Sequence, residues 1–448
     1  MEREVRNKME WSRLICDKRL GMEEYHDERR HTRSDFQRDY DRLIFSSPFR
    51  RLQNKTQVFP LPGSIFVHNR LTHSLEVSSV GRSLAHEVAI RLKEKYSDAG
   101  LHRKFDDIRD IVAAACLCHD LGNPPFGHSG EKTIATFFSE GPGIALRERF
   151  SDREWADFAN FEGNANSFRL LTHQFKGRRR GGMAMTYSTL ATIVKYPYTS
   201  LHAGSKGKFG FFASEEEIYR RVAGELGIPE LEPGRFARHP LVYILEAADD
   251  ICYQIMDIED AHKLRILTTG QVKRLFLGFF DEASHPRLQR VVDGLSDPNE
   301  QIAYLRSGVV GAMVSSCADA FMEHEEEMLA GSFEGNLVGS LPVLLRDAYA
   351  ACSATAWEKI YCAPMVVDIE LAGNRIVSFL MQTLVEAVMH PERNYSRLLF
   401  NVIPQQYDVA SRSDYGRIQS VLDHVSGMTD VYALDLYRKL NGHSLPAV

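Results

Sequence analysis

Two adjacent ionisable side chains, His119 and Asp120, follow a long apolar run in the sequence. The run over residues 106–117 has the pattern of a buried helix, and Gly122 and Pro124 are residues that end one. An imidazole and a carboxylate beside so much apolar surface are costly to bury unless they bind something. The pair therefore predicts a bound ligand, and a divalent cation is the simplest one.

Two other helical segments supply matching side chains. His73 lies in a predicted helix that begins near residue 68, and Asp249 lies in the clearest helical pattern, over residues 239–261. A lone histidine on a helix is more often structural, so His73 gains weight only from the other three residues. Nitrogen and oxygen ligands without a thiolate suit Mn²⁺ or Mg²⁺, and Fe²⁺ and Zn²⁺ also accept them. Such an ion polarises phosphoryl oxygens, which predicts a hydrolase of phosphate esters or anhydrides.

A second histidine, His128, precedes Glu131 by three positions at the start of the next predicted helix. Residues at this spacing lie on one face of a helix. Glu131 at a helix N-terminus has a plain alternative role, which is to complement the helix dipole. The sharper interpretation is that Glu131 holds His128 in one tautomer for acid–base chemistry.

Helical periodicity dominates the remaining chain. A capping box at Ser34 and Gln37 predicts a helix from about residue 35, and residues 270–390 read as helix with few chemical landmarks. We expect residues 49–63 to be extended, because the segment is rich in cations and ends in proline and glycine. Residues 200–212 are expected to form a flexible loop and a candidate lid. The pattern as a whole predicts an all-α fold with at most a minor β-hairpin.

Composition narrows the class of protein. With 448 residues and 44% apolar side chains, the chain is long enough for a large core or several domains. The formal net charge of −6 argues against wholesale nucleic-acid coating. Seven scattered cysteines without a C-x-x-C pair argue against disulfides and zinc knuckles. With no apolar leader or membrane-length run, we expect a soluble, cytoplasmic protein without a membrane partner.

The ordered set of histidines and aspartates resembles the HD-domain phosphohydrolases. Longer strings narrow the resemblance to bacterial deoxyguanosine triphosphate triphosphohydrolases (dGTPases) and extend it from about Trp11 to Leu440. These strings are RSDFQRDYDRLIFSSPFRRLQNKTQVFPL, NRLTHSLEV, HDLGNPPFGHSGE, FEGNAN, EAADDICY and SGMTD. The resemblance implies cleavage of dGTP, or of other dNTPs, between the 5′ oxygen and the α-phosphorus. The products would be a deoxynucleoside and inorganic triphosphate.

The resemblance also implies roles for individual residues. The metal ligands would be His73, His119, Asp120 and Asp249. His128, paired with Glu131, would act at the α-phosphate as acid, base or nucleophile. The remaining residues implied in substrate binding are Arg70 and Lys195 at the phosphates, Tyr253 and Asp257 at the sugar, Gln57 and Val58 at the base, and Arg417 from a neighbouring subunit.

Three regions follow from this assignment. Residues 1–65 would form an N-terminal helical and base-facing segment, residues 66–275 the HD core, and residues 276–448 a helical region packed against that core. The resemblance implies a homo-oligomer, with a hexamer favoured, in which the C-terminal helices form natural contacts. A single-stranded DNA or dNTP effector is consistent with the basic loops.

Two alternatives stay open on sequence alone. One is an HD-domain phosphodiesterase or (p)ppGpp hydrolase, which release of phosphate from a ribonucleotide 3′ position would favour. The other is a dNTP- or DNA-responsive binding assembly in which hydrolysis is secondary. A gel shift that persists as salt is raised would favour this second alternative.

Overall fold

The computed structural model describes residues 8–24, 33–59 and 67–444. Residues 1–7, 25–32 and 60–65 of the predicted 1–65 region lie outside these ranges, and they include residues 60–63 of the expected extended segment. In the described residues the sheet structure is one antiparallel pair, β1 (Glu230–Glu232) and β2 (Arg235–Phe236). The prediction of an all-α fold with at most a minor hairpin is therefore confirmed.

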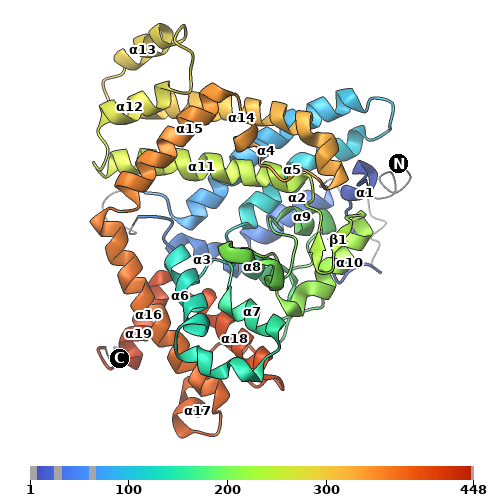
Figure 1. The fold of residues 1–448 in the computed structure, drawn as a ribbon, viewed down its shortest axis with the longest axis vertical. Coiled ribbons are helices and arrows are strands. Elements are labelled where there is room, and N and C mark those ends of the chain that lie inside the picture. Colours follow the sequence, from blue (N-terminus) through green and yellow to red (C-terminus); the bar gives the residue numbers. More distant parts are fainter. Residues whose placement is uncertain (1–7, 25–32, 60–66, 445–448) are drawn as a thin grey trace.

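Helices follow one another along the whole described chain (Figure 1). The first half contains α1 (Trp11–Leu14), α2 (Asp35–Ile44), α3 (Ser47–Arg51), α4 (Arg70–Lys95), α5 (His102–Cys118), α6 (Gly127–Ser139), α7 (Asp152–Ala159), α8 (Gly163–Thr172), α9 (Tyr187–Thr192) and α10 (Glu216–Leu226). The second half contains α11 (Leu241–Lys263), α12 (Thr269–Leu277), α13 (His285–Asp293), α14 (Pro298–Ala330), α15 (Val343–Thr355), α16 (Pro364–Met389), α17 (Asn394–Phe400), α18 (Asp414–Ser426) and α19 (Asp430–Leu440). Short 3-10 turns cover Leu52–Asn54, Pro142–Arg149, Ser200–His202, Gly204–Lys206, Ala213–Glu215 and Val338–Ser340, and one π-helical turn covers Ala356–Ile360.

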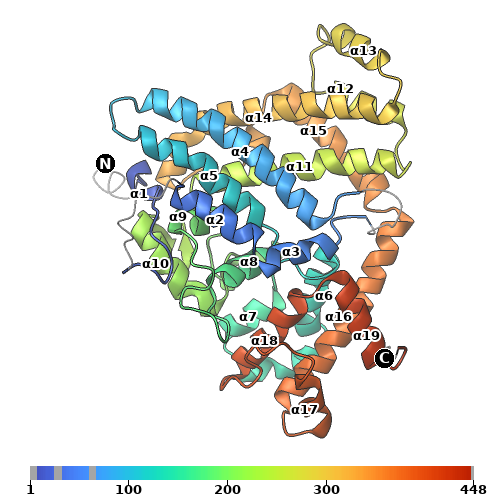
Figure 2. The ribbon, with the colours of Figure 1, turned by 180° about the vertical axis from the view of Figure 1, so that it is seen from behind.

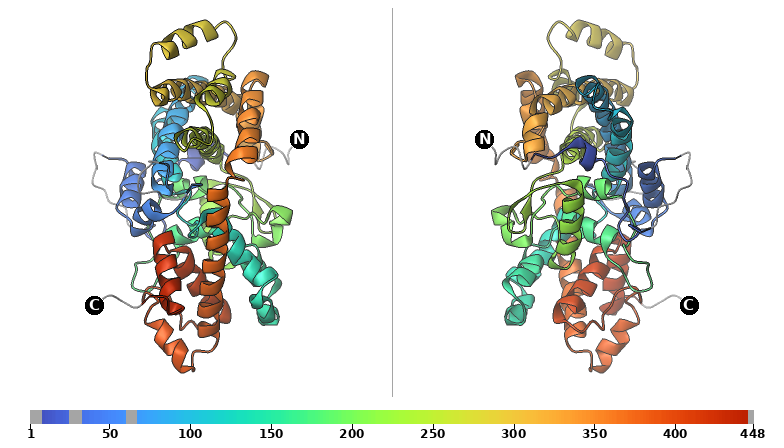
Figure 3. Two further views of the ribbon diagram at one scale, coloured as in Figure 1. Left: turned by 90° about the vertical axis from the view of Figure 1, so that its left-hand side faces the viewer. Right: turned by 90° about the vertical axis from the view of Figure 1, so that its right-hand side faces the viewer.

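The helices form an upper and a lower group (Figures 1 and 2). α11 packs against α4 and α14, and α5 packs against α4. These four helices lie in the upper half of the molecule together with α12, α13 and α15 (Figures 1 and 2). The lower half contains α6, α7 and the C-terminal helices α17 to α19. α16 runs down one side and packs against both α6 and α18 (Figure 3). The C-terminal region therefore lies directly against the helix that carries His128.

Local sequence explains where the site-bearing helices begin. The Ser34 and Gln37 capping box is present at α2, as predicted. Asn69 caps α4 by accepting from the backbone N–H of Thr72, so α4 starts at Arg70 and places His73 in its first turn. Every residue of α5 from Ile111 to Cys118 is buried, which agrees with its apolar sequence. The N-cap of each helix and its apolar face together determine which side chains point into the core.

The expected extended conformation of residues 49–63 is wrong for its first part. Residues Ser47–Arg51 form α3, and Leu52–Asn54 continue as a 3-10 turn. Ser46 accepts from the N–H of Phe49 and so caps this helix. Pro48 is tolerated because the first turn of a helix does not need its N–H. Proline here marks a helix start and not an interruption.

The cysteines form no disulfide in the part of the chain that the structure describes, as expected from their scattered positions. All seven cysteines are free, and five of them are buried. Within the described ranges, no helix combines the length and apolarity needed to cross a bilayer.

Burial of His239 predicts a pH-dependent stability. Desolvation lowers the pKa of this imidazole from 6.5 to about 4, and its Nδ1 accepts from the N–H of Leu241. Between these pKa values the unfolded chain binds more protons, so the free energy of unfolding falls as pH drops through this window. The free energy of unfolding carries the full benefit of the neutral His239 above pH 6.5. Below about pH 4 this benefit is lost, and the loss amounts to about 3 kcal/mol at most.

Urea unfolding at several pH values measures this effect. We expect His239→Gln to show a shallower loss of stability between pH 7 and pH 4 than the wild type. His102→Gln, at an exposed histidine of α5, is the matched control and should keep the wild-type slope. Equal slopes for all three proteins would contradict the prediction.

Candidate metal centre and active site

Three helices bring His73, His119 and Asp249 together. One ligand atom from each of these residues lies within 4.8 Å of the others. Asp249 Oδ1 is 3.2 Å from His73 Nε2 and 3.3 Å from His119 Nε2. The two imidazole rings meet edge to face at a centroid distance of 5.4 Å. Side chains far apart in sequence thus form a compact cluster with two nitrogen ligands and one carboxylate.

The surroundings of His119 fit a metal ligand. Its Nδ1–H donates to the carbonyl oxygen of Cys116 at 2.7 Å, and in this tautomer Nε2 keeps a free lone pair. Nε2 is buried and has no hydrogen-bond partner, although a buried polar atom normally has one. An imidazole nitrogen aimed at a second imidazole and a carboxylate, and left unsatisfied there, is the arrangement that a cation completes.

Asp120 lies beside this cluster but not within it. Its Oδ1 is 3.5 Å from His119 Nε2, yet Asp120 does not belong to the set of atoms within 4.8 Å of one another. Its carboxylate instead accepts from Arg70 Nη1 at 2.6 Å and from Asn123 Nδ2 at 2.6 Å. Of the four predicted ligands, the structure brings three into one cluster and leaves the fourth at its edge.

The two cations predicted at the phosphates contact Asp249 in the cluster and Asp120 at its edge. Lys195 Nζ donates to Asp249 Oδ2 at 2.5 Å, and Arg70 is paired with Asp120. Burial would raise the pKa of Asp249, but Lys195 and His119 outweigh it and hold that pKa well below its usual range. Arg70 Nε is buried without a partner, so this guanidinium keeps donor capacity for an anion.

A backbone clamp holds the turn that follows α5. The N–H of Gly122 donates to Ser167 Oγ at 2.9 Å, and Ser167 Oγ donates to the carbonyl of His119 at 2.8 Å. Asn166 Nδ2 donates to the carbonyl of Gly122 at 2.7 Å. A Cβ on Gly122 would come within 2.2 Å of backbone atoms of α8, so only glycine allows this approach. The FEGNANS stretch thereby fixes the direction of His119.

His128 and Glu131 pair as predicted from their spacing. His128 Nδ1 lies 3.1 Å from Glu131 Oε2, and the His128 side chain is 65% exposed. Glu131 is buried, and its Oε1 accepts from the N–H of Gly163 at 2.6 Å. Desolvation opposes ionisation of Glu131, but the bonds from His128 and the charge of Lys208 lower its pKa to about 2. A charged carboxylate therefore orients an exposed imidazole.

Sequence reasoning missed a lysine and a second carboxylate beside this pair. Lys208 Nζ lies 2.6 Å from Glu162 Oε1 and 3.6 Å from Glu131 Oε2. Burial and the nearby Glu131 raise the pKa of Glu162 to about 7. Lys208 belongs to the predicted flexible loop, whose three phenylalanines are buried and anchor it: Phe209, Phe211 and Phe212. No local pattern indicated that these charges meet.

The residues predicted at the sugar share one aromatic neighbour. Tyr253 stacks on Tyr361 with a centroid distance of 6.1 Å, and the Tyr361 hydroxyl donates to Asp257 Oδ2 at 2.9 Å. Desolvation raises the pKa of Asp257 to about 8. Tyr361 lies just after the π-helical turn and had no signal in the sequence. Its hydroxyl occupies one of the two carboxylate oxygens of Asp257 and leaves Oδ1 without this bond.

The residues predicted at the base and from a neighbouring subunit are Gln57, Val58 and Arg417. Gln57 and Val58 are half-buried, and Gln57 Oε1 is buried without a hydrogen-bond partner. Arg417 donates to the carbonyl of Ser411 and pairs with Asp414 at 3.2 Å. Its described contacts are thus within its own segment, and the structure does not bring it to the metal cluster. Its predicted role involves a second subunit and stays a prediction.

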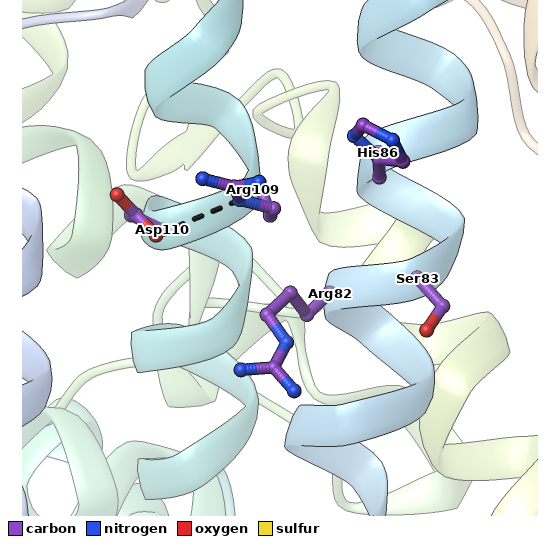
Figure 4. A pocket seen from close by; sticks show the side chains of 5 residues that line it. All are labelled: Arg82, Ser83, His86, Arg109 and Asp110. Carbon is purple, nitrogen blue, oxygen red and sulfur yellow. Dashed lines mark ion pairs between the residues drawn. The ribbon is translucent and has the colours of Figure 1, made fainter.

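A cavity of about 320 Å³ lies elsewhere, between α4 and α5 (Figure 4). Its walls are Arg82, Ser83, His86, Arg109 and Asp110. None of these residues belongs to the predicted site, and Arg109 is 3.9 Å from its own neighbour Asp110.

Comparisons with known proteins agree with this geometry. Residues 70–192 match the HD domain family model, and residues 343–439 match the phosphohydrolase-associated domain. A deoxyguanosinetriphosphate triphosphohydrolase-like protein of Pseudomonas aeruginosa (strain LESB58) is 36% identical over 452 residues, which cover 98% of this chain and 100% of the relative. The chain belongs to this family of HD-domain phosphohydrolases.

Other relatives in the family cover nearly the whole chain as well. A protein of the same name from Synechocystis sp. is 36% identical over 461 residues, or 98% of this chain and 100% of the relative. A deoxyguanosinetriphosphate triphosphohydrolase of Yersinia enterocolitica is 32% identical over 488 residues, or 90% of this chain and 93% of the relative. HD domains are metal-dependent hydrolases, and His73, His119 and Asp249 form a cluster that could hold the ion.

Proposed function

We propose that this chain hydrolyses dGTP, and to a lesser extent other dNTPs, to a deoxynucleoside and inorganic triphosphate. The observation that carries the proposal is an exposed histidine, His128, oriented by a buried carboxylate in a chain that matches the curated relatives along 98% of its length. His73, His119, Asp249 and the adjacent Asp120 would hold Mn²⁺ or Mg²⁺. When bound, that ion would polarise the phosphoryl group and activate water.

The chain's own residues supply binding and proton transfer. Arg70 and Lys195 would neutralise the phosphates, since each is a buried or nearly buried cation beside the cluster. His128 would deliver or accept a proton at the α-phosphate, with Glu131 keeping its Nδ1 engaged. Asp257 and Tyr253 would contact the sugar, and Gln57 offers an unsatisfied acceptor for the base.

Product analysis tests the proposal directly. Purified protein with Mn²⁺, and separately with Mg²⁺, would be incubated with dGTP in water enriched in ¹⁸O. We expect deoxyguanosine and triphosphate by ion chromatography, with the label in the triphosphate, because attack at the α-phosphorus breaks the P–O5′ bond. Formation of dGMP and pyrophosphate would overturn the proposal, and label in the deoxynucleoside would overturn attack at phosphorus.

Tyr253 should control the preference for deoxyribose. Its ring stacks on Tyr361, whose hydroxyl donates to Asp257. We propose that a ribose 2′-hydroxyl would clash with this ring. The ratio of kcat/KM for dGTP to kcat/KM for GTP measures this preference. We expect Tyr253→Ala to lower the ratio by about tenfold or more, because loss of the ring leaves space for the ribose 2′-hydroxyl. Tyr253→Phe keeps the ring and should keep the ratio. An unchanged ratio in the alanine variant would contradict a steric role.

The assembly and its regulation complete the proposal. We propose a homo-oligomer, with a hexamer favoured, in which Arg417 of one subunit approaches the substrate of another. Analytical ultracentrifugation with and without dNTPs or single-stranded DNA tests both the assembly and the effector.

A further inference from the structure

One carboxylate joins two distant segments of the active-site region. Asp430, in the first turn of α19, accepts from the backbone N–H of Thr56 at 2.8 Å through Oδ2. Its Oδ1 accepts from the backbone N–H of Phe126 at 2.9 Å. Asp430 is 8% exposed, and its bond to Thr56 is buried, whereas its bond to Phe126 is partly buried. Such charge-assisted bonds to a carboxylate are among the stronger ones in proteins.

The two donors stand next to residues of the proposed mechanism. Thr56 directly precedes Gln57 and Val58, the predicted base-facing pair. Phe126 is the residue before α6, whose second residue is His128. Asp430 thus fixes the segment expected to face the base relative to the helix that carries the reacting histidine.

Phe126 needs this support because its backbone is unfavourable. Its φ angle of 62° lies in the left-handed region, which is sterically unfavourable for any residue with a Cβ. Its ring packs so closely on α16 that a Cβ at Gly373 would come within 2.6 Å of it. Residues in such conformations persist only where their surroundings hold them, and they cluster at functional sites.

A second link crosses the same junction. Lys55, which is buried, donates to the carbonyl of Asn123 at 2.5 Å and to the carbonyl of Ser426 at 2.8 Å. On α6 itself, Ser129 donates to the carbonyl of Glu370 at 3.0 Å. The start of α6 is therefore held from the C-terminal side, in the part of the chain that matches the phosphohydrolase-associated domain.

We propose that Asp430 is a positioning residue that sets His128 and the base-facing segment in one register. This inference rests on the proposed function of His128. A carboxylate has two acceptor oxygens and can serve both N–H groups at once, whereas an asparagine has one acceptor and turns an NH₂ towards the other donor. Loss of the register displaces the imidazole from the reacting phosphate, and small displacements of this kind cost about 10²-fold in rate.

The test compares Asp430→Asn with Thr429→Ala in the full-length protein. Thr429 caps α19 by accepting from the N–H of Tyr432 and touches neither Thr56 nor Phe126 through a hydrogen bond. Both variants weaken the start of α19, but only the first breaks the double link. We expect Asp430→Asn to lower kcat for dGTP by about 10- to 100-fold, with Thr429→Ala close to wild type.

A double-mutant cycle separates positioning from general destabilisation. If Asp430 acts through His128, the Asp430→Asn change should cost little further activity in a His128→Ala background. Additive losses, or equal losses in Asp430→Asn and Thr429→Ala, would overturn the inference.

Hydrogen exchange keeps the test independent of the proposed reaction. Asp430→Asn should speed amide exchange in peptides covering residues 55–58 and 124–130, while Thr429→Ala should leave them protected. If the wild type hydrolyses no dNTP, the proposed function fails. Amide exchange then still tests whether Asp430 holds the segments of Thr56 and Phe126 together. Unchanged exchange in Asp430→Asn would overturn the inference whatever the activity.

Discussion

Replacing Asp249 by asparagine should abolish the proposed binding of a divalent ion and lower kcat/KM for dGTP by roughly 10³-fold or more. Asp249 is the residue on which the cluster converges, because its Oδ1 lies near both imidazoles and its Oδ2 accepts from Lys195. Asparagine keeps the shape and loses the charge. The Lys195 ammonium then faces an uncharged amide, and two imidazoles and an ammonium lack their anion.

Two measurements check this expectation. Metal content after dialysis reports binding, and steady-state kinetics over a range of Mn²⁺ concentrations report catalysis. Asp250→Asn is the matched control, since it makes the same chemical change at the next position of α11 and should retain most of the activity and the metal. A metal-loaded, active Asp249→Asn protein would rule out the cluster as the metal centre.

Replacing His128 by alanine should lower kcat by about 10²- to 10⁴-fold, the range for loss of a positioned general acid or base. Because the side chain is 65% exposed, the substitution should cost little stability. The metal content should stay at the wild-type level, because His128 belongs to α6 and not to the cluster. This separation of catalysis from metal binding distinguishes His128 from Asp249.

The chain offers a second histidine–glutamate pair as the control, although its histidine is less exposed than His128. His324 and Glu327 on α14 form the same pairing three residues apart, with Nδ1 3.3 Å from the carboxylate. His324→Ala should leave kcat unchanged, because that pair lies on another helix without the Lys208 and Glu162 neighbours. Wild-type kcat in His128→Ala would exclude an acid–base role for His128.

The features that could be predicted from sequence are those set by local periodicity and spacing. The stripe of α11 and the capping box of α2 follow from side-chain pattern alone, and both are present. The pairing of His128 with Glu131 follows from their separation by one helical turn. The helix over residues 47–51 was missed because a proline in a first turn reads as an interruption until its cap is seen.

Only the tertiary structure decided which distant groups meet. Glu131 meets Lys208 and Glu162, and Asp257 meets Tyr361, because separate helices and loops pack side by side. Asp430 reaches Thr56 and Phe126 across nearly the whole sequence. Asp120 lies at the edge of the metal cluster because Arg70 and Asn123 hold its carboxylate.

The sequence by itself determined the helical class, the family and the identity of the ionisable residues, because periodicity and motif spacing are local properties. Helix packing decided how those residues lie relative to one another, because hydrogen bonds between distant segments form only after the helices assemble. The candidate metal ligands could therefore be proposed from the chain alone, but only the fold showed that three of the four, His73, His119 and Asp249, form one cluster. The carboxylate proposed to align α6 with the segment expected to face the base also needed the fold.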